Sequence, residues 1–342
     1  MPRASTLIAF SAAAVLTLGL AGCSTSPAAD TAEAASGDFT PVTIEHAFGE
    51  TVIEAKPERV ATVNWANQEV PLALGVVPVG MAAATWGDDD TDGMLPWVKE
   101  KLDELGGETP VLFDETDGID FEAVADTKPD VILAAYSGLT QEDYDTLSAI
   151  APVVAYPETA WGTSWRDMIS QNAAGMGMAA EGDDLIAELE TEIAATAAKY
   201  PSLEGKTAMF LTHVDEADLS EVSFYTTHDT RTMFFDDLGL VSAPSIIKAS
   251  DATDLYSLTV SAEQSDAFSD VDLIVTYGGA DLVATLEGDP LLSQIPAVAN
   301  KSIVNLSGDG PMGTAANPTP LSISYILDDY AALLAAAADN AQ

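Results

Sequence analysis

The stretch that decides the predicted fold is residues 164–200, which read SWRDMISQNAAGMGMAAEGDDLIAELETEIAATAAKY. Its apolar residues recur at steps of three and four, which is the period of a helix. Three glycines between positions 175 and 182 predict a short first helix and a longer second one, and Pro201 ends the second. A helix from Gly182 to Tyr200 would be roughly 28 Å long at 1.5 Å per residue. We therefore expect a rigid connection between two lobes.

The sequence on both sides of this stretch alternates apolar strands with helices. Strands that are apolar throughout and alternate with helices predict parallel sheets covered on both faces. We predict an α/β protein with two Rossmann-like lobes and mainly parallel sheets, residues 39–165 and 201–342, joined by a single long helix within residues 166–200. The predicted buried strands are 60–63, 76–81, 130–135 and 153–156 in the first lobe and 207–212, 272–276 and 302–306 in the second, and the predicted helices of the two lobes are 68–74, 233–238, 262–268 and 321–338.

The N-terminus has the pattern of a targeting segment. Arg3 precedes an apolar run, residues 7–20, that is too short to span a membrane, so we predict a signal peptide over residues 1–22. The run ends in Leu-Ala-Gly-Cys, which resembles the bacterial lipobox and implies lipidation of Cys23; the alternative is an ordinary signal peptide with an incidental cysteine. Residues 23–38 offer little to bury and predict a flexible tether. The expected location is therefore outside the cytoplasm, anchored to the cell membrane through the lipid alone.

Composition excludes several classes of protein. The single cysteine excludes a disulfide framework and a cysteine-based metal site. The formal charge is −43, and removal of residues 1–22 takes away only Arg3, leaving −44. So negative a chain is not expected to bind nucleic acid. The 342 residues, 47% of them hydrophobic, suffice for two domains with separate cores.

Two sequence signatures carry a family resemblance. The first is His-Ala-Phe-Gly-Glu-Thr at 46–51 followed by Lys-Pro-Glu-Arg-Val at 56–60, and the second is Phe-Glu-Ala-Val at 121–124 followed by Lys-Pro-Asp-Val-Ile at 128–132. They resemble the periplasmic-binding-protein family for ferric siderophores and cobalamin, over about residues 39–335. The resemblance implies a monomeric receptor that holds its ligand between two lobes and delivers it to the permease dimer of an ABC importer. It implies no catalytic step and no cofactor.

Glu122 and Glu263 are candidate docking residues for the transporter. Each lies on a short predicted helix, eight or nine residues before an aspartate that opens a buried strand. In the family that the sequence resembles, one surface glutamate per lobe docks into arginine pockets of the membrane dimer, and two separated anionic points would set orientation. The alternative is that both are solvated helix carboxylates. Glu263 departs from the family pattern, because the Lys-Pro-Asp that follows Glu122 has no counterpart there.

The ligand is expected at the carboxyl ends of the strands, where loops from both lobes meet. A ferric siderophore already satisfies its metal, so the protein needs flat aromatic surfaces and a few donors and no metal ligands of its own. Arg231, one of three arginines in the mature chain, stands in a polar loop where it could reach a ligand oxygen; the alternative is a surface ion pair. For the aromatic residues the alternative is a plug of the lobe core. The candidates are Trp65, Trp86, Tyr136, Trp161, Tyr225, Arg231 and Tyr277, with Asn64, His213 and His228 as further candidates by position.

The low number of cations favours one ligand class. A highly anionic ferric tris-catecholate would be repelled, so a neutral or cationic hydroxamate fits the charge of the chain better. Cobalamin or haem in the same cleft is the nearest alternative, and an extracytoplasmic α/β enzyme is a remoter one, because no nucleophile–base pair is evident. Three dispersed histidines disfavour a direct zinc or manganese receptor. Residues Asp88–Asp92 resemble the start of a calcium loop, but its closing position falls on Lys99.

Overall fold

The computed structural model describes residues 39–308 and 310–341. The predicted signal peptide, Cys23 and the tether lie outside the described residues.

The first of the two large sheets is parallel throughout. Its strand order is β5-β4-β3-β6-β7, and β6 pairs in register with both β3 and β7. The predicted strands of the first lobe are confirmed to within a few residues, and β5 was not predicted. Before this sheet the chain forms an antiparallel hairpin. The strands are β1 (Val42–His46), β2 (Gly49–Ile53), β3 (Val60–Thr62), β4 (Gly80–Ala82), β5 (Val111–Phe113), β6 (Val131–Ala134) and β7 (Val153–Ala155).

The second large sheet is mixed. Its order is β11-β9-β8-β12-β13, with β10 paired to β8. Strands β8, β12 and β13 are parallel, as predicted, whereas β9 runs antiparallel to both β8 and β11. Two separate sheets, mainly parallel, confirm the predicted fold class. The strands are β8 (Thr207–His213), β9 (Glu221–Tyr225), β10 (Val241–Ser242), β11 (Ser257–Ser261), β12 (Leu273–Tyr277) and β13 (Ile303–Leu306).

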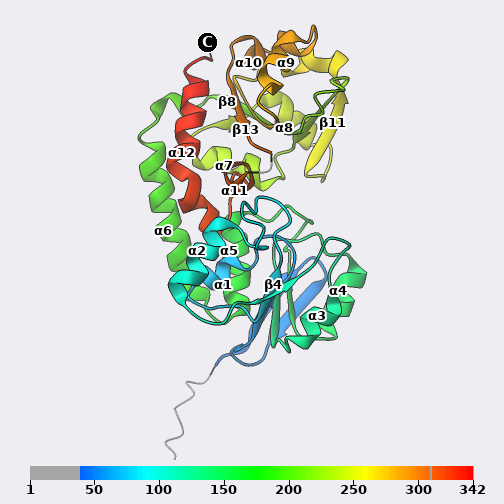
Figure 1. The fold of residues 1–342 in the computed structure, drawn as a ribbon, viewed down its shortest axis with the longest axis vertical. Coiled ribbons are helices and arrows are strands. Elements are labelled where there is room, and N and C mark those ends of the chain that lie inside the picture. Colours follow the sequence, from blue (N-terminus) through cyan, green and yellow to red (C-terminus); the bar gives the residue numbers. More distant parts are fainter. Residues whose placement is uncertain (1–38, 309, 342) are drawn as a thin grey trace, which may run out of the picture. The chain divides into compact units, whose positions relative to one another are not determined.

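Helices cover both faces of each sheet (Figure 1). In β6, Ile132 and Ala134 belong to an apolar cluster with α3 and α4, whereas Val131 and Leu133 belong to the cluster that contains α5. This alternation explains why the strand is apolar at every position. The helices are α1 (Glu69–Ala73), α2 (Pro96–Leu105), α3 (Phe121–Asp126), α4 (Gln141–Ser148), α5 (Trp165–Gly175), α6 (Ala179–Ala197), η1 (Pro201–Leu203), α7 (Thr230–Asp237), α8 (Pro244–Ser250), η2 (Ala262–Phe268), α9 (Leu282–Gly288), η3 (Leu292–Gln294), α10 (Pro296–Ala299), α11 (Pro311–Ala315) and α12 (Pro320–Ala338).

The connecting segment consists of a shorter helix, α5, and a longer one, α6, as predicted. The break between them is at Gly177, whose φ of +66° is a left-handed conformation that favours glycine. Gly182 was predicted to belong to the break, and this is wrong: it lies in the first turns of α6. A Cβ atom on Gly182 would stand 2.6 Å from the Cβ of Ala173, so this glycine allows α6 to pack closely against α5.

Helix α12 is a second long element beside α6 (Figure 1). Its N-terminus is fastened to the first lobe by Glu69 of α1, a fully buried residue. The Glu69 carboxylate accepts hydrogen bonds from the backbone N–H of Leu321 at 2.9 Å, from Nε1 of Trp97 at 2.7 Å and from the hydroxyl of Thr319. Burial raises the pKa of Glu69, and these donors partly offset the effect. The C-terminal helix therefore packs against elements of both halves of the chain.

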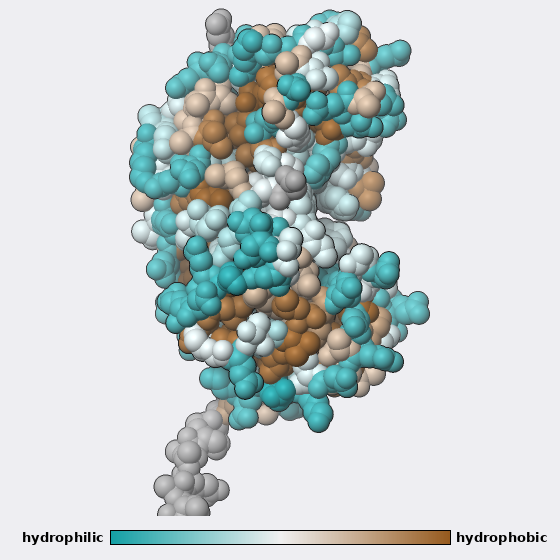
Figure 2. Space-filling model, viewed as in Figure 1, coloured by the Kyte–Doolittle hydropathy of each residue, from teal (hydrophilic) through white to brown (hydrophobic). Residues whose placement is uncertain are grey.

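The core is continuous between the two halves, which corrects the expectation of two separate cores. One apolar cluster includes Leu133 of β6, Leu189 of α6, Phe210 of β8 and Leu327 of α12. Only the outer layers, under α3 and α4 in one half and under α8 to α10 in the other, form separate clusters. On the face shown in Figure 2, hydrophilic residues are spread over the surface with apolar patches between them. The shared apolar layer leaves little freedom for hinge motion between the halves.

Candidate functional site

Six of the seven predicted ligand residues line one cavity of about 260 Å³, which we name the aromatic cavity. The loops that follow β3, β4, β6 and β7 contribute aromatic side chains from the first half of the chain, and β9, α7 and the segment around α11 contribute residues from the second half. The carboxyl ends of parallel strands meet at one edge of a sheet, which explains why residues so distant in sequence converge. The lining residues are Trp65, Trp86, Tyr136, Trp161, Tyr225, Asp229, Arg231, Tyr256, Thr314 and Asn317.

Arg231 is the cation of the aromatic cavity, and its guanidinium is fixed from three sides. Nη1 donates to both carboxylate oxygens of Asp229, at 2.9 and 3.1 Å, and Nε donates to the hydroxyl of Tyr277 at 3.0 Å. The guanidinium carbon lies 4.4 Å from the ring centroid of Tyr225, a cation–π contact. Nη2 makes no hydrogen bond to any residue that the structure describes. The arginine therefore presents one free edge in a fixed orientation.

The ion pair is buried, whereas the alternative stated for Arg231 was an ion pair at the surface. Contact of Arg231 with a ligand stays a prediction. The side chains of Arg231 and Asp229 are 11% and 1% exposed. Burial opposes the charge of Arg231, but the attraction of Asp229 outweighs it, and the pKa of Arg231 lies above its ordinary value. The prediction that Arg231 stands in a loop is wrong: it lies in the first turn of α7, for which Asp229 is the N-cap.

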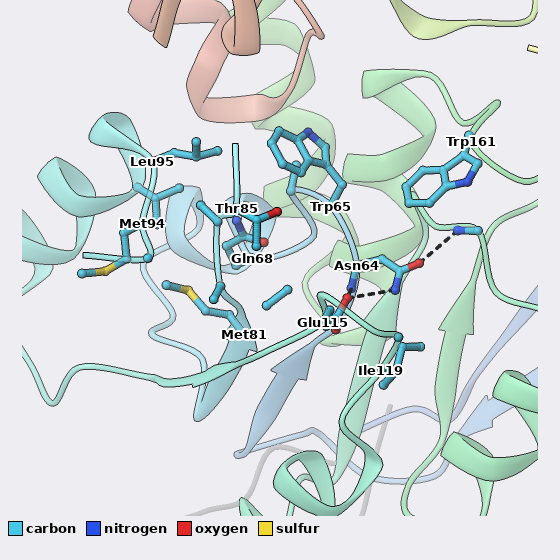
Figure 3. A pocket seen from close by; sticks show the side chains of 18 of the residues that line it. Asn64, Trp65, Gln68, Met81, Thr85, Met94, Leu95, Glu115, Ile119 and Trp161 are labelled. Carbon is cyan, nitrogen blue, oxygen red and sulfur yellow. Dashed lines mark hydrogen bonds between the residues drawn. The ribbon is translucent and has the colours of Figure 1, made fainter. Parts of the chain in front are cut away.

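A second cavity, of about 360 Å³, adjoins the first, and we name it the acidic cavity (Figure 3). Trp65 and Trp161 line both cavities. The charged residues that line the acidic cavity are Glu115 and Asp143. Its described lining includes no lysine, arginine or histidine. The remaining lining is polar or apolar: Asn64, Ala66, Gln68, Met81, Ala82, Ala83, Ala84, Thr85, Gly93, Met94, Leu95, Val98, Gly118, Ile119 and Gly138.

Asn64 positions Glu115. Asn64 adopts a φ of +59°, a left-handed conformation that asparagine tolerates better than most residues. Its backbone N–H and Nδ2 donate to the Glu115 carboxylate at 3.0 and 3.1 Å, and its Oδ1 accepts from the backbone N–H of Gly138 at 3.0 Å. One side chain thus joins the loops that follow β3, β5 and β6 (Figure 3).

Burial raises the pKa of Glu115 to about 7, and the two hydrogen bonds from Asn64 only partly oppose the shift. No ion pair is formed by Glu115 among the described residues, and no cation contributes to the shift. This carboxyl group therefore titrates near neutral pH at the wall of a cavity.

Comparison with known proteins identifies the fold family. The model of the periplasmic binding protein family matches residues 60–309. A solved structure of PiaA from Streptococcus pneumoniae in complex with ferrichrome is 43% identical, with a TM-score of 0.84 over 88% of this chain and 99% of that one. Among curated proteins, the probable siderophore-binding lipoprotein YfiY of Bacillus subtilis is 26% identical over 261 residues, 75% of this chain and 74% of that protein. The ferric-anguibactin-binding protein FatB of Vibrio anguillarum is 26% identical over 85% of this chain and 86% of its own.

The chain belongs to the periplasmic binding protein family. The fold class and the resemblance that the sequence carries are thereby confirmed, and this periplasmic binding protein is a solute receptor and not an enzyme.

Tyr277 is the one predicted ligand residue that does not line the aromatic cavity. It is completely buried, with its ring stacked on His213 at 4.9 Å and in edge contact with Trp86 at 5.7 Å. Its hydroxyl accepts the hydrogen bond from Arg231. In this periplasmic binding protein Tyr277 therefore fixes the orientation of the Arg231 guanidinium and does not itself line the aromatic cavity.

The further candidates by position fall at three different places. Asn64 lines the acidic cavity. His213 lies against Tyr277 and Trp86 outside the aromatic cavity. Nε2 of His228 lies 3.2 Å from the carbonyl oxygen of Ser250 and 2.9 Å from that of Thr253, so this ring ties a loop in place.

Four lining residues of the aromatic cavity were not predicted: Asp229, Tyr256, Thr314 and Asn317. Asp229 could have been found, because aspartate is a preferred N-cap residue and α7 begins at the next position. Asn317 lies between α11 and α12, and its Nδ2 donates to the hydroxyl of Tyr136 at 3.2 Å. No local sequence pattern indicates that this late segment returns to the cavity.

The two candidate docking residues occupy matching positions. Glu122 is exposed in the first turn of α3, where Asp120 is the cap, and Glu263 is exposed in the first turn of η2, where Ser261 is the cap. Helix α3 leads into β6, and η2 leads into β12. The two glutamates therefore occupy equivalent positions, each on the short helix that precedes a central strand.

Three carboxylates of the calcium-like loop, those of Asp88, Asp90 and Asp92, have hydrogen-bond partners within the protein. Asp88 accepts from the backbone N–H groups of Asp90, Thr91 and Gly93, and Asp92 pairs with Lys99. The acidic residues therefore stabilise a turn by accepting hydrogen bonds from its backbone.

Proposed function

We propose that this protein captures an iron(III)–siderophore outside the cytoplasm and delivers it to the permease of an ABC importer. The observation that carries the proposal is the aromatic cavity, where indole and phenol rings surround a single guanidinium with a free edge. Flat rings suit the periphery of a metal chelate, and the guanidinium suits its oxygen ligands. The similarity to a ferrichrome complex at 43% identity supports the same ligand class.

The charges of the site favour a hydroxamate over a catecholate. In the aromatic cavity Asp229 neutralises Arg231, and the adjoining cavity adds carboxyl groups without a cation. A ferric tris-catecholate carries three negative charges and would meet no uncompensated positive charge here. Ferrichrome, which is bound by a relative, is a hydroxamate.

Quenching of tryptophan fluorescence tests the ligand class directly, because three of the lining residues are tryptophans. The purified chain is titrated with a ferric trihydroxamate, a ferric tris-catecholate and haem. We expect binding of the hydroxamate at least tenfold tighter than that of the catecholate. Tighter binding of the catecholate would reject the hydroxamate assignment, and a haem spectrum shifted by axial coordination, with no siderophore bound, would replace the function by that of a haem receptor.

We also propose that Glu122 and Glu263 contact the permease. The matched first-turn positions of the two exposed carboxylates support this role. Replacing both by alanine should abolish uptake of the ferric siderophore in cells and leave its affinity for the isolated protein unchanged. Replacing Glu54 and Glu108, two exposed glutamates elsewhere, provides the matched control. Uptake that survives in the docking variant would assign both residues to solvated surface.

Residues 1–22 are proposed to be a signal peptide and Cys23 the lipidated residue, and curated relatives described as lipoproteins support this. Metabolic labelling with palmitate should mark the wild-type chain and not a Cys23→Ala variant. A labelled variant, or a soluble wild-type chain, would contradict the lipid anchor.

A further inference from the structure

The acidic cavity carries an inference that deepens the proposed function and rests on it. Its described lining carries carboxyl and amide oxygens but no cation. Glu115 is one acceptor, held toward the cavity by Asn64 (Figure 3).

Gln68 is the second acceptor and an independent observation. It is 6% exposed and lines the cavity, and its Oε1 is buried without a hydrogen-bond partner among the described residues. Gln68 stands at the N-cap of α1 but does not cap that helix. An unpaired buried amide oxygen lowers the stability of the folded protein, so a ligand that donates a hydrogen bond to it would recover that free energy.

The aromatic walls complete the chemistry. Trp65 and Trp161 line both cavities, so a ligand whose chelate lies in the aromatic cavity can extend past these rings into the acidic cavity. Indole faces attract cations. A carboxyl group, an amide oxygen and two indoles around one space match a protonated amine, and they match neither a carboxylate nor a catecholate.

We propose that the acidic cavity is a subsite for a pendant ammonium group of the siderophore, with Glu115 and Gln68 as its acceptors. The protein then distinguishes ferric hydroxamates by their substituents as well as by their chelating groups. A chelate with a free amine binds more tightly than the same chelate with that amine acylated.

The test compares two ferric linear trihydroxamates at pH 8, one with a terminal primary amine and the same compound N-acetylated. With the wild-type chain we expect the amine to bind about tenfold more tightly, which is the usual value of a hydrogen bond to a charged group. Glu115→Gln should reduce that ratio to about two or less. Glu54→Gln, which removes an equal charge from an exposed position, should keep the full ratio.

The outcomes separate the subsite from the function. Equal binding of both compounds by the wild-type chain overturns the subsite and leaves the receptor function standing. A preference that persists in Glu115→Gln, or an equal loss of affinity for both compounds in that variant, overturns the assignment of Glu115. Binding of neither compound overturns the hydroxamate function itself.

Discussion

The aromatic cavity and the acidic cavity share two tryptophans but treat charge in opposite ways. In the first, Arg231 and Asp229 form a buried pair, so the charge there is compensated and fixed in place. In the second, Glu115 has no cation and titrates near pH 7. Under the proposed function, one cleft would combine a fixed ion pair beside a neutral chelate with a pH-dependent contact to its substituent.

Removal of Arg231 is expected to have the largest effect. Arg231→Ala leaves Asp229 buried without its partner, which should lower the free energy of unfolding by about 3–5 kcal/mol and the affinity for a ferric hydroxamate by about 100-fold. Urea denaturation and fluorescence titration measure the two quantities. The double variant Asp229→Asn/Arg231→Met removes both charges and should recover most of the stability but not the affinity. Recovered affinity in that variant would show that the guanidinium does not contact the ligand.

Substitutions of two tryptophans are expected to have the next largest effect, and they distinguish the contributions of the two cavities to binding. Trp86 lines only the aromatic cavity, whereas Trp161 lines both. Trp86→Ala should weaken the amine and acetylated chelates equally, by about tenfold, whereas Trp161→Ala should weaken the amine about two- to fivefold more than the acetylated compound, because it also removes a cation–π contact. Isothermal titration of both variants with both compounds measures the ratios. Identical ratios for the two variants would place the amine outside the acidic cavity.

The pH dependence of the amine preference should be smaller but diagnostic. Glu115 is ionised above its pKa of about 7 and neutral below it, whereas an alkyl amine with a pKa of about 10.4 remains charged throughout. The preference should therefore fall from about tenfold at pH 8.5 to about twofold at pH 5.5, and Glu115→Gln should show a flat profile. The neighbouring titratable groups are Asp143 on α4 and Asp114 and Asp117 in the same loop as Glu115. The control variant is Asp114→Asn. Loss of the pH dependence in that variant would show that Glu115 is not the titrating group.

Gln68→Leu should have the smallest effect. It removes the unpaired Oε1, so we expect the free energy of unfolding to rise by up to about 1 kcal/mol and the amine preference to fall about threefold. Thermal denaturation and the paired titration measure both changes. A lower stability would show that Gln68 has a partner in solution.

The fold could be predicted from the sequence where strands are apolar on both faces. Strands β6, β8 and β12 were placed within about two residues because nearly every position is buried. Strand β9 was missed because its side chains alternate between buried Val222 and Phe224 and more exposed neighbours, so no continuous apolar run marks it. Gly182 was misassigned because sequence does not distinguish a helix-breaking glycine from one that allows close packing.

The sequence could predict which types of residue form the site, but not which way their side chains point. Tyr225 and Tyr277 both end strands, yet the first lines the cavity and the second lies behind Arg231. Which of two neighbouring strand-end rings faces the cavity depends on packing against the adjacent loops. Glu115 was not a candidate at all, because its environment is created by Asn64 and by burial, neither of which is visible around position 115.

The clamp of Glu69 on the start of α12 has a consequence for biosynthesis. Glu69 is made early and its partners Thr319 and Leu321 almost last, 250 residues later. Until the end of the chain has left the ribosome, two of the three donors to this buried carboxylate, from Thr319 and Leu321, are missing. The nascent polypeptide therefore cannot complete its native structure during translation.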